Sequence, residues 1–360
     1  MSIEIVQVPT PERWDDESEG ARLLRAYVDV RNAVVVELFG GDASHAFSYR
    51  QAWAQWRNQR GVEEALRPLA LLDGEPVGRG YAARSLLEAQ TIAEVDVLVR
   101  SDARRRGVAT ALADDMLGRM RAQGATTFQA WVDHHPAPGP VLRAPTGVGE
   151  VPAETAAVRL LQRYGFELEQ VERMSELAVA DATEALAEHR ATAEQRALPR
   201  YRVQRWQGRT PPERIDALAA LHARMSTDAP AAGLEHEPER WDAQRLRAYE
   251  DAQVEGGRTL LRAIAVDEAT DAVVAFTTLV SAGDSAAWYQ HDTLVHGEHR
   301  GHRLGMLVKA ANLEALLVAA PDAIVRTWNA AENVHMLAVN ESLGFRRVLD
   351  EGAWQRKDAT

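Results

Sequence analysis

Short apolar runs alternate along the chain with longer segments in which apolar residues recur at helical spacing. The short runs predict strands, and turn segments such as Asp73–Glu75 and Glu268–Asp271 join two pairs of them into hairpins. Helical spacing is clear between Leu304 and Leu316. The predicted strands are Ile3–Val8, Pro68–Leu72, Val77–Ala82, Glu94–Val99 and Thr126–Val132 in the first half, and Tyr201–Trp206, Leu260–Val266, Val273–Val280, Gln290–Val295 and Ile324–Trp328 in the second. Helices between the strands predict an α/β fold with a mixed sheet in each half.

The two halves repeat one another. Val95–Val99 aligns without a gap with His291–Val295, and Arg104 matches Arg300 at the same offset of 196 positions. Further on, Gly165 matches Gly344 at an offset of 179. The first copy therefore holds 17 extra residues, the difference between the two offsets. We place them in the Pro- and Gly-rich segment His134–Pro152, which is typical of a loop.

Length and composition indicate where the copies meet. A chain of 360 residues favours two domains. Residues 179–199 are rich in Ala and Glu and poor in large apolar residues, which is typical of a partly helical linker. We therefore predict an amino-terminal domain at residues 1–178 and a carboxy-terminal domain at residues 200–360.

Charge and cysteine content exclude several kinds of function. The formal net charge is −12, which disfavours nucleic acid as a partner. The chain has no cysteine, so disulfides, thiolate catalysis and cysteine–zinc sites are excluded, and we expect no metal site. No signal-peptide pattern begins the sequence, and no apolar stretch approaches the ~20 residues of a membrane span. We expect a cytoplasmic protein with no membrane partner, either a monomer or a homodimer.

In each copy a predicted strand ends in a short turn that opens a helix. Small residues allow a ligand to approach the backbone, the free N–H groups of the first helical turn point at an anion, and arginine adds a charge-assisted contact. These turns therefore predict phosphate binding. They consist of Arg104, Arg105, Arg106, Gly107, Val108 and Ala109 in the first copy, and of Arg300, Gly301, His302, Arg303, Leu304 and Gly305 in the second.

The turn and the residues that follow it have a family resemblance. A Val-rich strand leads into Arg-x-x-Gly-x-Ala or its variant, then a helix and a strand, and the second copy continues with Trp328-Asn329, Asn333–Met336 and Asn340–Phe345. This order resembles the GCN5-related N-acetyltransferase (GNAT) family. The two copies resemble its tandem, two-domain type, of which mycothiol synthase is the named example.

The resemblance implies two tandem GNAT-like domains, each with a mixed, mostly antiparallel sheet whose fourth and fifth strands splay apart. In that family, the pantetheine arm of acetyl-CoA enters between these strands, and the turn holds the pyrophosphate. The implied reaction is transfer of the acetyl group to the amine of a small molecule by direct attack. Besides the two turns, the residues implied to bind the acetyl-CoA are Leu98, Val99, Leu294, Val295, Asn329 and Asn333.

The sequence departs from the family pattern at its usual acid, a tyrosine on the helix after the fifth strand. Asn340 stands there in the second copy and Leu161 in the first. Arg303 stands where the family has glycine, so it either blocks the site or turns outward to grip a phosphate, and we favour the second interpretation. Glu154 stands in the first copy where the second has Asn333. Because the second copy keeps polar residues near the expected thioester, we expect catalysis there, with Asn340 in the catalytic set.

Candidates for the general base come from the fourth strand of the second copy. Asp292 lies in a predicted strand, where aspartate is disfavoured, but Asp96 at the same position of the first copy also fits an architectural carboxylate. His291 is a second candidate, since an imidazole transfers protons near neutral pH. The acidic segments Met225–Pro230 and Glu235–Glu237 fit an ammonium-binding acceptor site or simply a solvated loop.

Two other functions stay open at this point. A non-catalytic acyl-CoA-binding sensor or scaffold would explain the missing acid in both copies. A transferase of longer acyl groups would need a wider opening between the fourth and fifth strands.

Overall fold

A computed structural model describes residues 2–88, 91–228, 230–283 and 285–358, which form two compact units. Unit 1 comprises residues 1–171, 231–237 and 351–360, and unit 2 comprises residues 172–230 and 238–350. Two strands, β9 (Glu167–Ala178) and β15 (Arg346–Lys357), contribute residues to both units. The other elements of unit 1 are β1 (Ile3–Gln7), α1 (Glu19–Leu38), η1 (Ala43–His45), α2 (Tyr49–Asn58), β2 (Glu63–Leu66), β3 (Pro68–Leu72), β4 (Glu75–Ser85), β5 (Ile92–Val99), η2 (Ser101–Ala103), α3 (Val108–Ala122), β6 (Thr127–His134), β7 (Val141–Arg143), β8 (Glu150–Pro152) and α4 (Ala156–Arg163). Those of unit 2 are η3 (Val179–Ala182), α5 (Thr183–Ala197), β10 (Tyr201–Gln207), α6 (Pro212–Ala223), α7 (Met225–Asp228), α8 (Ala243–Glu255), β11 (Leu260–Asp267), β12 (Val273–Ser281), β13 (Ala287–Val295), η4 (Gly297–His299), α9 (Leu304–Ala319), β14 (Ile324–Ala330) and α10 (Val334–Ser342).

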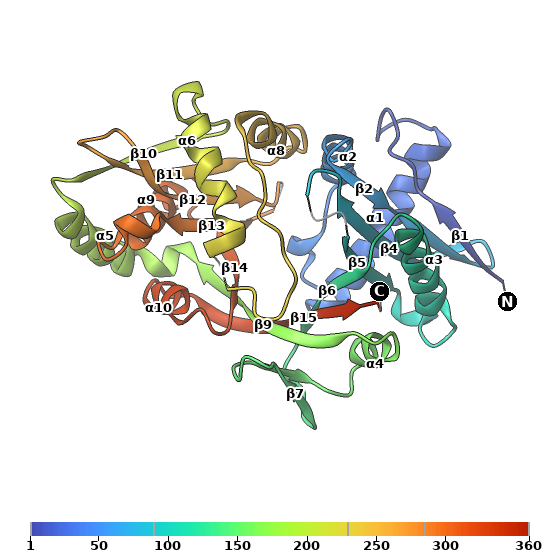
Figure 1. The fold of residues 1–360 in the computed structure, drawn as a ribbon. Coiled ribbons are helices and arrows are strands. Elements are labelled where there is room, and N and C mark those ends of the chain that lie inside the picture. Colours follow the sequence, from blue (N-terminus) through green and yellow to red (C-terminus); the bar gives the residue numbers. More distant parts are fainter. Residues whose placement is uncertain (1, 89–90, 229, 284, 359–360) are drawn as a thin grey trace. The chain divides into compact units, whose positions relative to one another are not determined.

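Unit 1 is a twisted sheet covered by helices on both faces (Figure 1). Its strands run in the order β1-β3-β4-β5-β6-β15, with β2 beside β4. The pairs from β1 to β5 are antiparallel, and β5 pairs with β6 in parallel. Apolar residues of α1 and α2 pack with Leu69 on one face, and α3 packs with Ala70 and Leu72 on the other. The alternation of apolar side chains along β3 thus supplies both halves of the core.

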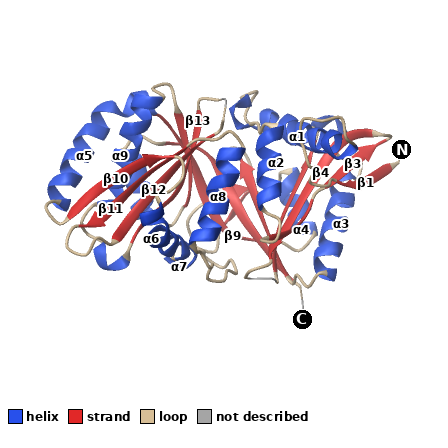
Figure 2. Ribbon diagram, turned by 90° about the horizontal axis from the view of Figure 1, so that it is seen from above, coloured by secondary structure: helices blue, strands red, loops and turns tan. Residues whose placement is uncertain are grey.

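Unit 2 repeats this plan. The order is β10-β11-β12-β13-β14, and residues 172–178 of β9 pair with β14. As in unit 1, one pair is parallel, β13 with β14, and the other pairs are antiparallel. Helices α5 and α9 pack on one face of β11, and α6 packs on the other (Figure 2). Each half therefore has the predicted α/β fold with a mixed sheet.

Three segments differ from their sequence-based expectation. The expected linker contains α5, whose residues Leu186 and Ala193 are buried in the core of unit 2. The expected loop His134–Pro152 contains a small hairpin of β7 and β8. Residues 231–237 and 351–360 come from the second copy but belong to unit 1.

The parallel pair of each unit opens toward its carboxyl ends. β5 pairs with β6 only over Ile92–Glu94, although β5 continues to Val99. In unit 2, β13 pairs with β14 only over Ala287–Tyr289, and β13 continues to Val295. The predicted splay of the fourth and fifth strands is thus present in both units. Among the described residues, β5 beyond Glu94 and β13 beyond Tyr289 thus have no strand partner on the side of the opening, where the Val99 and Val295 carbonyls accept instead from arginine side chains.

Two glycines of unit 1 give a matched test of this packing. A Cβ at Gly80 would lie 2.6 Å from Met116 Sδ and 2.9 Å from Pro68 Cγ. Because Met116 is buried and the proline ring is rigid, we expect Gly80→Ala to lower the free energy of unfolding by about 1–3 kcal/mol. Gly118 lies inside α3, and apart from the helix's own backbone no described atom lies within 4 Å of an added Cβ, so Gly118→Ala should raise it by about 1 kcal/mol. Urea unfolding measures both, and an unchanged midpoint for Gly80→Ala would show that β4 and α3 pack less closely than described.

Candidate functional site

The two predicted phosphate turns have the same backbone path. Each begins with a short 3₁₀ turn, η2 or η4, and ends at a residue in the left-handed conformation that caps the helix, Gly107 (φ 88°) or Arg303 (φ 56°). A second left-handed position lies two residues earlier, at Arg105 (φ 62°) or Gly301 (φ 83°). Each copy therefore has glycine at one of these two left-handed positions and arginine at the other. Unit 1 has the glycine next to the helix, where a ligand approaches the free N–H groups most closely.

The arginine at the start of each turn is tied to the strand that precedes it. The Nε of Arg104 donates to the Val99 carbonyl at 3.1 Å, and Arg300 donates likewise to Val295 at 3.4 Å. Arg104 also pairs with Glu37 at 3.2 Å while remaining exposed. Arg105, Arg106, Arg303 and Gly301 are exposed, and His302 is half-buried. The outward orientation favoured for Arg303 agrees with this exposure.

The remaining cofactor candidates line the start of each helix and the end of each strand. Val108 and Leu304 are buried and anchor the first turns of α3 and α9, so the adjacent Ala109 and Gly305 are half-buried. Leu98, Val99 and Val295 are half-buried, and Leu294 is buried. Because these side chains pack against the protein, the last residues of each strand offer their backbone groups to a ligand.

The second copy carries its catalytic candidates on an irregular strand. The pairing of β12 with β13 shifts between Thr277 and Leu279, so that His291 and Asp292 lie in a β-bulge. His291 stays accessible, but the protein around its imidazole desolvates it and lowers its pKa to about 4. A group with so low a pKa is a weak proton acceptor at neutral pH.

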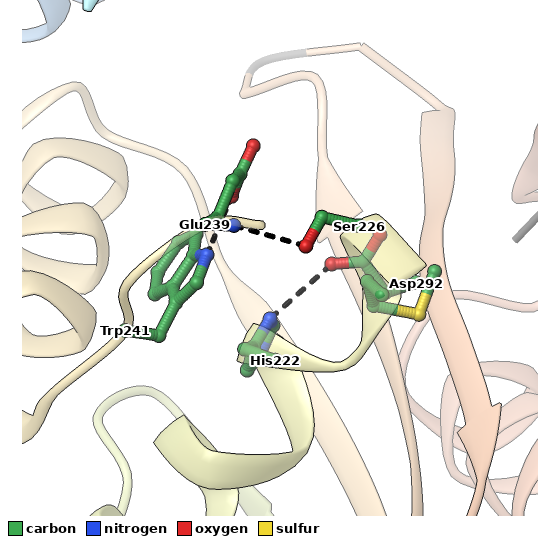
Figure 3. Close-up of a pocket in the computed structure, with 6 residues that line it drawn as sticks. His222, Ser226, Glu239, Trp241 and Asp292 are labelled. Carbon is green, nitrogen blue, oxygen red and sulfur yellow. Dashed lines mark hydrogen bonds and ion pairs between the residues drawn. The ribbon is translucent and has the colours of Figure 1, made fainter. Parts of the chain in front are cut away.

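Asp292 faces a pocket of about 360 Å³ in unit 2 (Figure 3). His222 Nδ1 lies 3.4 Å from Asp292 Oδ2, and the carboxylate side chain is 42% exposed. Partial burial works to raise the Asp292 pKa, but the hydrogen bond from His222 and the electrostatic effects of His222, His291 and Arg262 outweigh it and lower the pKa. Asp292 is therefore an anion anchored by a histidine. The pocket is lined by His222, Met225, Ser226, Glu239, Trp241 and Asp292.

Asn340 lies in a buried polar chain. It is 2% exposed, accepts a hydrogen bond from Lys309 Nζ at 2.7 Å and donates to Asn329 at 2.6 Å. Lys309 is 1% exposed, and burial lowers its pKa to about 7. The side-chain oxygen of Asn340, which was expected near the thioester, thus already accepts a hydrogen bond from Lys309, a residue that the sequence analysis did not single out.

The capping residues of the two following helices stand one position apart in the repeat. Asn333 caps α10 and accepts from the N–H of Met336 at 3.3 Å. Helix α4 begins one residue later, so its cap is Thr155, which follows Glu154 and accepts from Val158 at 3.2 Å. Both side chains serve the first helical turn, as expected of an N-cap.

In unit 1, Asp96 is an architectural carboxylate. Its Oδ2 pairs with Arg79 at 2.6 Å, and the buried Arg79 lies 3.4 Å from the hydroxyl of Tyr27. Tyr27 in turn donates to the Gly80 carbonyl at 2.5 Å. The residue thus ties β5 to β4 and to α1.

Glu94 is the candidate base that the sequence analysis missed. It stands at the last paired position of β5 with β6, on the same face of β5 as Asp96. Its carboxylate is accessible and, within the described part of the chain, makes no hydrogen bond or ion pair. Desolvation by the surrounding protein, with repulsion from Asp96 and Glu63, raises the Glu94 pKa to about 7. The sequence did contain one signal. The repeat aligns Glu94 with Gln290, so an ionisable side chain stands at this position in the first copy only.

The acidic segment predicted to bind the acceptor in the second copy divides between the units. Met225 and Ser226 line the pocket of unit 2, and Ala229 lies outside the described residues. Glu235 belongs to unit 1, where it accepts from Thr127 Oγ1 at 2.6 Å and pairs with Lys357 at 2.7 Å. Its carboxylate is therefore not part of the unit 2 pocket.

The same segment lies beside the opening of unit 1. Gln129 is the β6 partner of Glu94, and its side-chain amide donates to the Glu235 carbonyl at 2.7 Å and to Gln355 at 2.9 Å. Paired residues of parallel neighbours point to the same face. The Glu235 segment therefore borders the face on which Glu94 stands.

Comparisons with known proteins agree with this geometry. Residues 27–138 match the model of the acetyltransferase (GNAT) family, whereas no curated protein sequence matches the chain. A tandem GNAT protein from the clavulanic acid biosynthesis pathway is similar in structure, with a TM-score of 0.73, 22% identity, and coverage of 100% of this chain and 99% of that one. A GCN5-related N-acetyltransferase from Sphaerobacter thermophilus gives 0.61 and 12%, with coverage of 99% and 95%. The predicted resemblance is confirmed: the chain has the tandem GNAT fold, and residues 27–138 within it carry the match to the acetyltransferase family.

Proposed function

We propose that this chain is an acyl-CoA-dependent N-acyltransferase that acetylates the amine of a small molecule, with its chemistry in unit 1. The observation that carries the proposal is Glu94, an accessible carboxylate with a pKa of about 7 at the point where β5 and β6 part. A base poised near the operating pH transfers protons most effectively. The sequence favoured the second copy, and the structure leads us to prefer the first.

The residues of unit 1 fit acetyl-CoA. The N–H groups of the first turn of α3 have no partner inside the helix and begin beside Gly107, where only Ile3 lies within 4 Å of an added Cβ. Arg104, Arg105 and Arg106 supply positive charge to this turn. The backbone of β5 beyond Glu94, which no longer pairs with β6, would hold the pantetheine arm, as in the family. When bound, acetyl-CoA supplies the acyl group as a thioester.

Glu94 has two tasks in this reaction. Its carboxylate, with Asp96 and Glu63 nearby, attracts a substrate ammonium to the opening. It then takes the ammonium proton, directly or through a water, and releases the neutral amine as nucleophile. As the amine forms the new C–N bond, the C–S bond breaks, the electron pair leaves with the thiolate, and the second proton of the amine passes to the thiolate or to solvent. At the family's usual acid position, unit 1 has Leu161, which donates no proton.

We further propose that unit 2 is non-catalytic. Its Asn340 is already held by Lys309 and Asn329, and the residue that caps α9, next to the free N–H groups, is Arg303 in place of the glycine of unit 1. The family match at residues 27–138 also lies in unit 1. These observations support a structural or ligand-binding role for the second copy.

Calorimetric titration with acetyl-CoA tests which turn binds the donor. We expect Arg104→Ala to weaken binding roughly 10- to 100-fold, the value of a hydrogen bond to a charged group, and Arg300→Ala to leave it unchanged. Glu37→Gln is the matched control, because it removes the ion pair of Arg104 without removing the arginine. Loss of binding in Arg300→Ala alone would assign the donor to unit 2 and contradict the proposal.

A further inference from the structure

Histidines are concentrated around the phosphate turn of unit 2. Four of the eleven in the chain fall between His291 and His302. Among them, His296 and His299 flank Glu298, and one ligand atom from each of the three lies within 4.8 Å of the other two. The two imidazole centroids are 5.7 Å apart. In a tetrahedral zinc site with bonds of about 2.0–2.2 Å, ligand atoms stand about 3.3–3.6 Å apart, so modest side-chain rotations would bring these three onto one ion.

The repeat shows what the cluster replaces. At the positions of His296, Glu298 and His299, the first copy has Arg100, Asp102 and Ala103. There the guanidinium of Arg100 pairs with Asp102 at 2.7 Å.

Unit 2 keeps the acid of that pair and loses its cation. Glu298 makes no ion pair within the described ranges. Histidine now stands both at the arginine position and at the alanine position. A metal cation held by the two imidazoles would restore the lost partner of the carboxylate.

Buried groups fix one of the imidazoles from behind. The hydroxyl of Tyr201 lies 2.9 Å from His299 Nδ1, and Asp267 Oδ2 lies 4.0 Å from the same nitrogen. Tyr201 is 1% exposed and Asp267 is 3% exposed. Metal-bound histidines commonly have their second ring nitrogen held in this way by a polar neighbour, which leaves the other nitrogen for the metal.

We propose that His296, Glu298 and His299 bind a divalent transition-metal ion, and that the ion is zinc by its ligand set. Two imidazoles and one carboxylate are a known zinc combination, and three protein ligands leave one coordination position for water or an anion. The ion would stand between the end of β13 and Arg300, at the start of the turn. The expectation of no metal site, which rested largely on the missing cysteines, is thereby replaced for this turn.

Metal titration of the whole chain tests the proposal. After removal of metals with a chelator, we expect one equivalent of Zn²⁺ to bind by calorimetry and one equivalent of Co²⁺ to give the visible absorption of a low-symmetry, four-coordinate site. His296→Ala and His299→Ala should each abolish this binding. His302→Ala is the matched control, because His302 lies in the same turn outside the cluster, and it should bind as the wild type does.

Thermal unfolding separates loss of a ligand from loss of the fold. Each variant has its own metal-free melting temperature as reference, and zinc should raise the melting temperature of the wild type and of His302→Ala only. Absence of stoichiometric binding, or binding that survives in both His296→Ala and His299→Ala, would overturn the proposal.

Discussion

Glu94→Gln is expected to lower turnover roughly 10²- to 10⁴-fold while leaving acetyl-CoA affinity unchanged. Glutamine keeps the size of the side chain and cannot take a proton from the substrate ammonium. Because Glu94 makes no hydrogen bond or ion pair through its carboxylate among the described residues, the substitution breaks no contact of the fold. Release of the free thiol measures turnover, and calorimetry measures affinity for the donor.

The pH profile of the wild type distinguishes a base from a binding carboxylate. With a pKa of about 7, Glu94 is protonated and inactive below that pH, so kcat should rise through about pH 7 and level off above it. The slow Glu94→Gln variant should lack this limb. The internal control is Asp292→Asn, which alters the best carboxylate of unit 2 and should leave turnover unchanged. The reverse pattern, with Asp292→Asn inactive and Glu94→Gln active, would return the chemistry to the second copy.

Much of the fold could be predicted because its signals are local. Turn residues such as Asp73-Gly74 indicate a hairpin. The alternation of apolar side chains in β3 and their helical spacing in α9 can each be recognised within about ten residues. The gapless match of Val95–Val99 with His291–Val295 then indicated that one plan occurs twice. The positions of the phosphate turns followed from the same local pattern.

The site could be predicted less well because its chemistry depends on distant residues. The pKa of Glu94 is raised in part by Glu63, which approaches it only because β2 and β5 both flank β4. Similarly, nothing near Glu235 indicates that this residue of the second copy pairs with Thr127 in the first. The architectural interpretation of Asp96, by contrast, agrees with its ion pair with Arg79.

Lys309 was hidden by its surroundings in sequence. It follows Leu307 and Val308 on a helix whose apolar pattern was recognised, and a lysine there is usually on the solvated face. In the structure, the amine lies against Met336 and Asn340 of α10 and over the ring of Phe345, so the lysine is enclosed. Tertiary packing of α10 therefore decides the state of this side chain.

Lys309→Met is expected to stabilise the protein at neutral pH by about 1–4 kcal/mol, because removal of the desolvated amine outweighs the loss of its hydrogen bond to Asn340. The folded pKa is about 7 against an ordinary value of 10.5, so between these limits the unfolded chain holds a proton that the folded chain has released. The free energy of unfolding of the wild type therefore rises with pH across that window. The destabilisation that the buried lysine causes is greatest at about pH 7 and below. Urea unfolding of the wild type and the variant from pH 6 to pH 10 measures this difference, which should shrink as the pH rises.

The chain offers a close control for this result, because its other lysine, Lys357, is 53% exposed in its side chain and pairs with Glu235. Lys357→Met should change stability little, and any effect should not follow the same pH window. A constant difference between Lys309→Met and the wild type at every pH would mean that Lys309 keeps an ordinary pKa. The amine would then be hydrated, and Asn340 would be open to solvent. Since the proposal that unit 2 is non-catalytic depends on Asn340 being held in a buried chain, that outcome would restore the second copy as a candidate for the thioester chemistry.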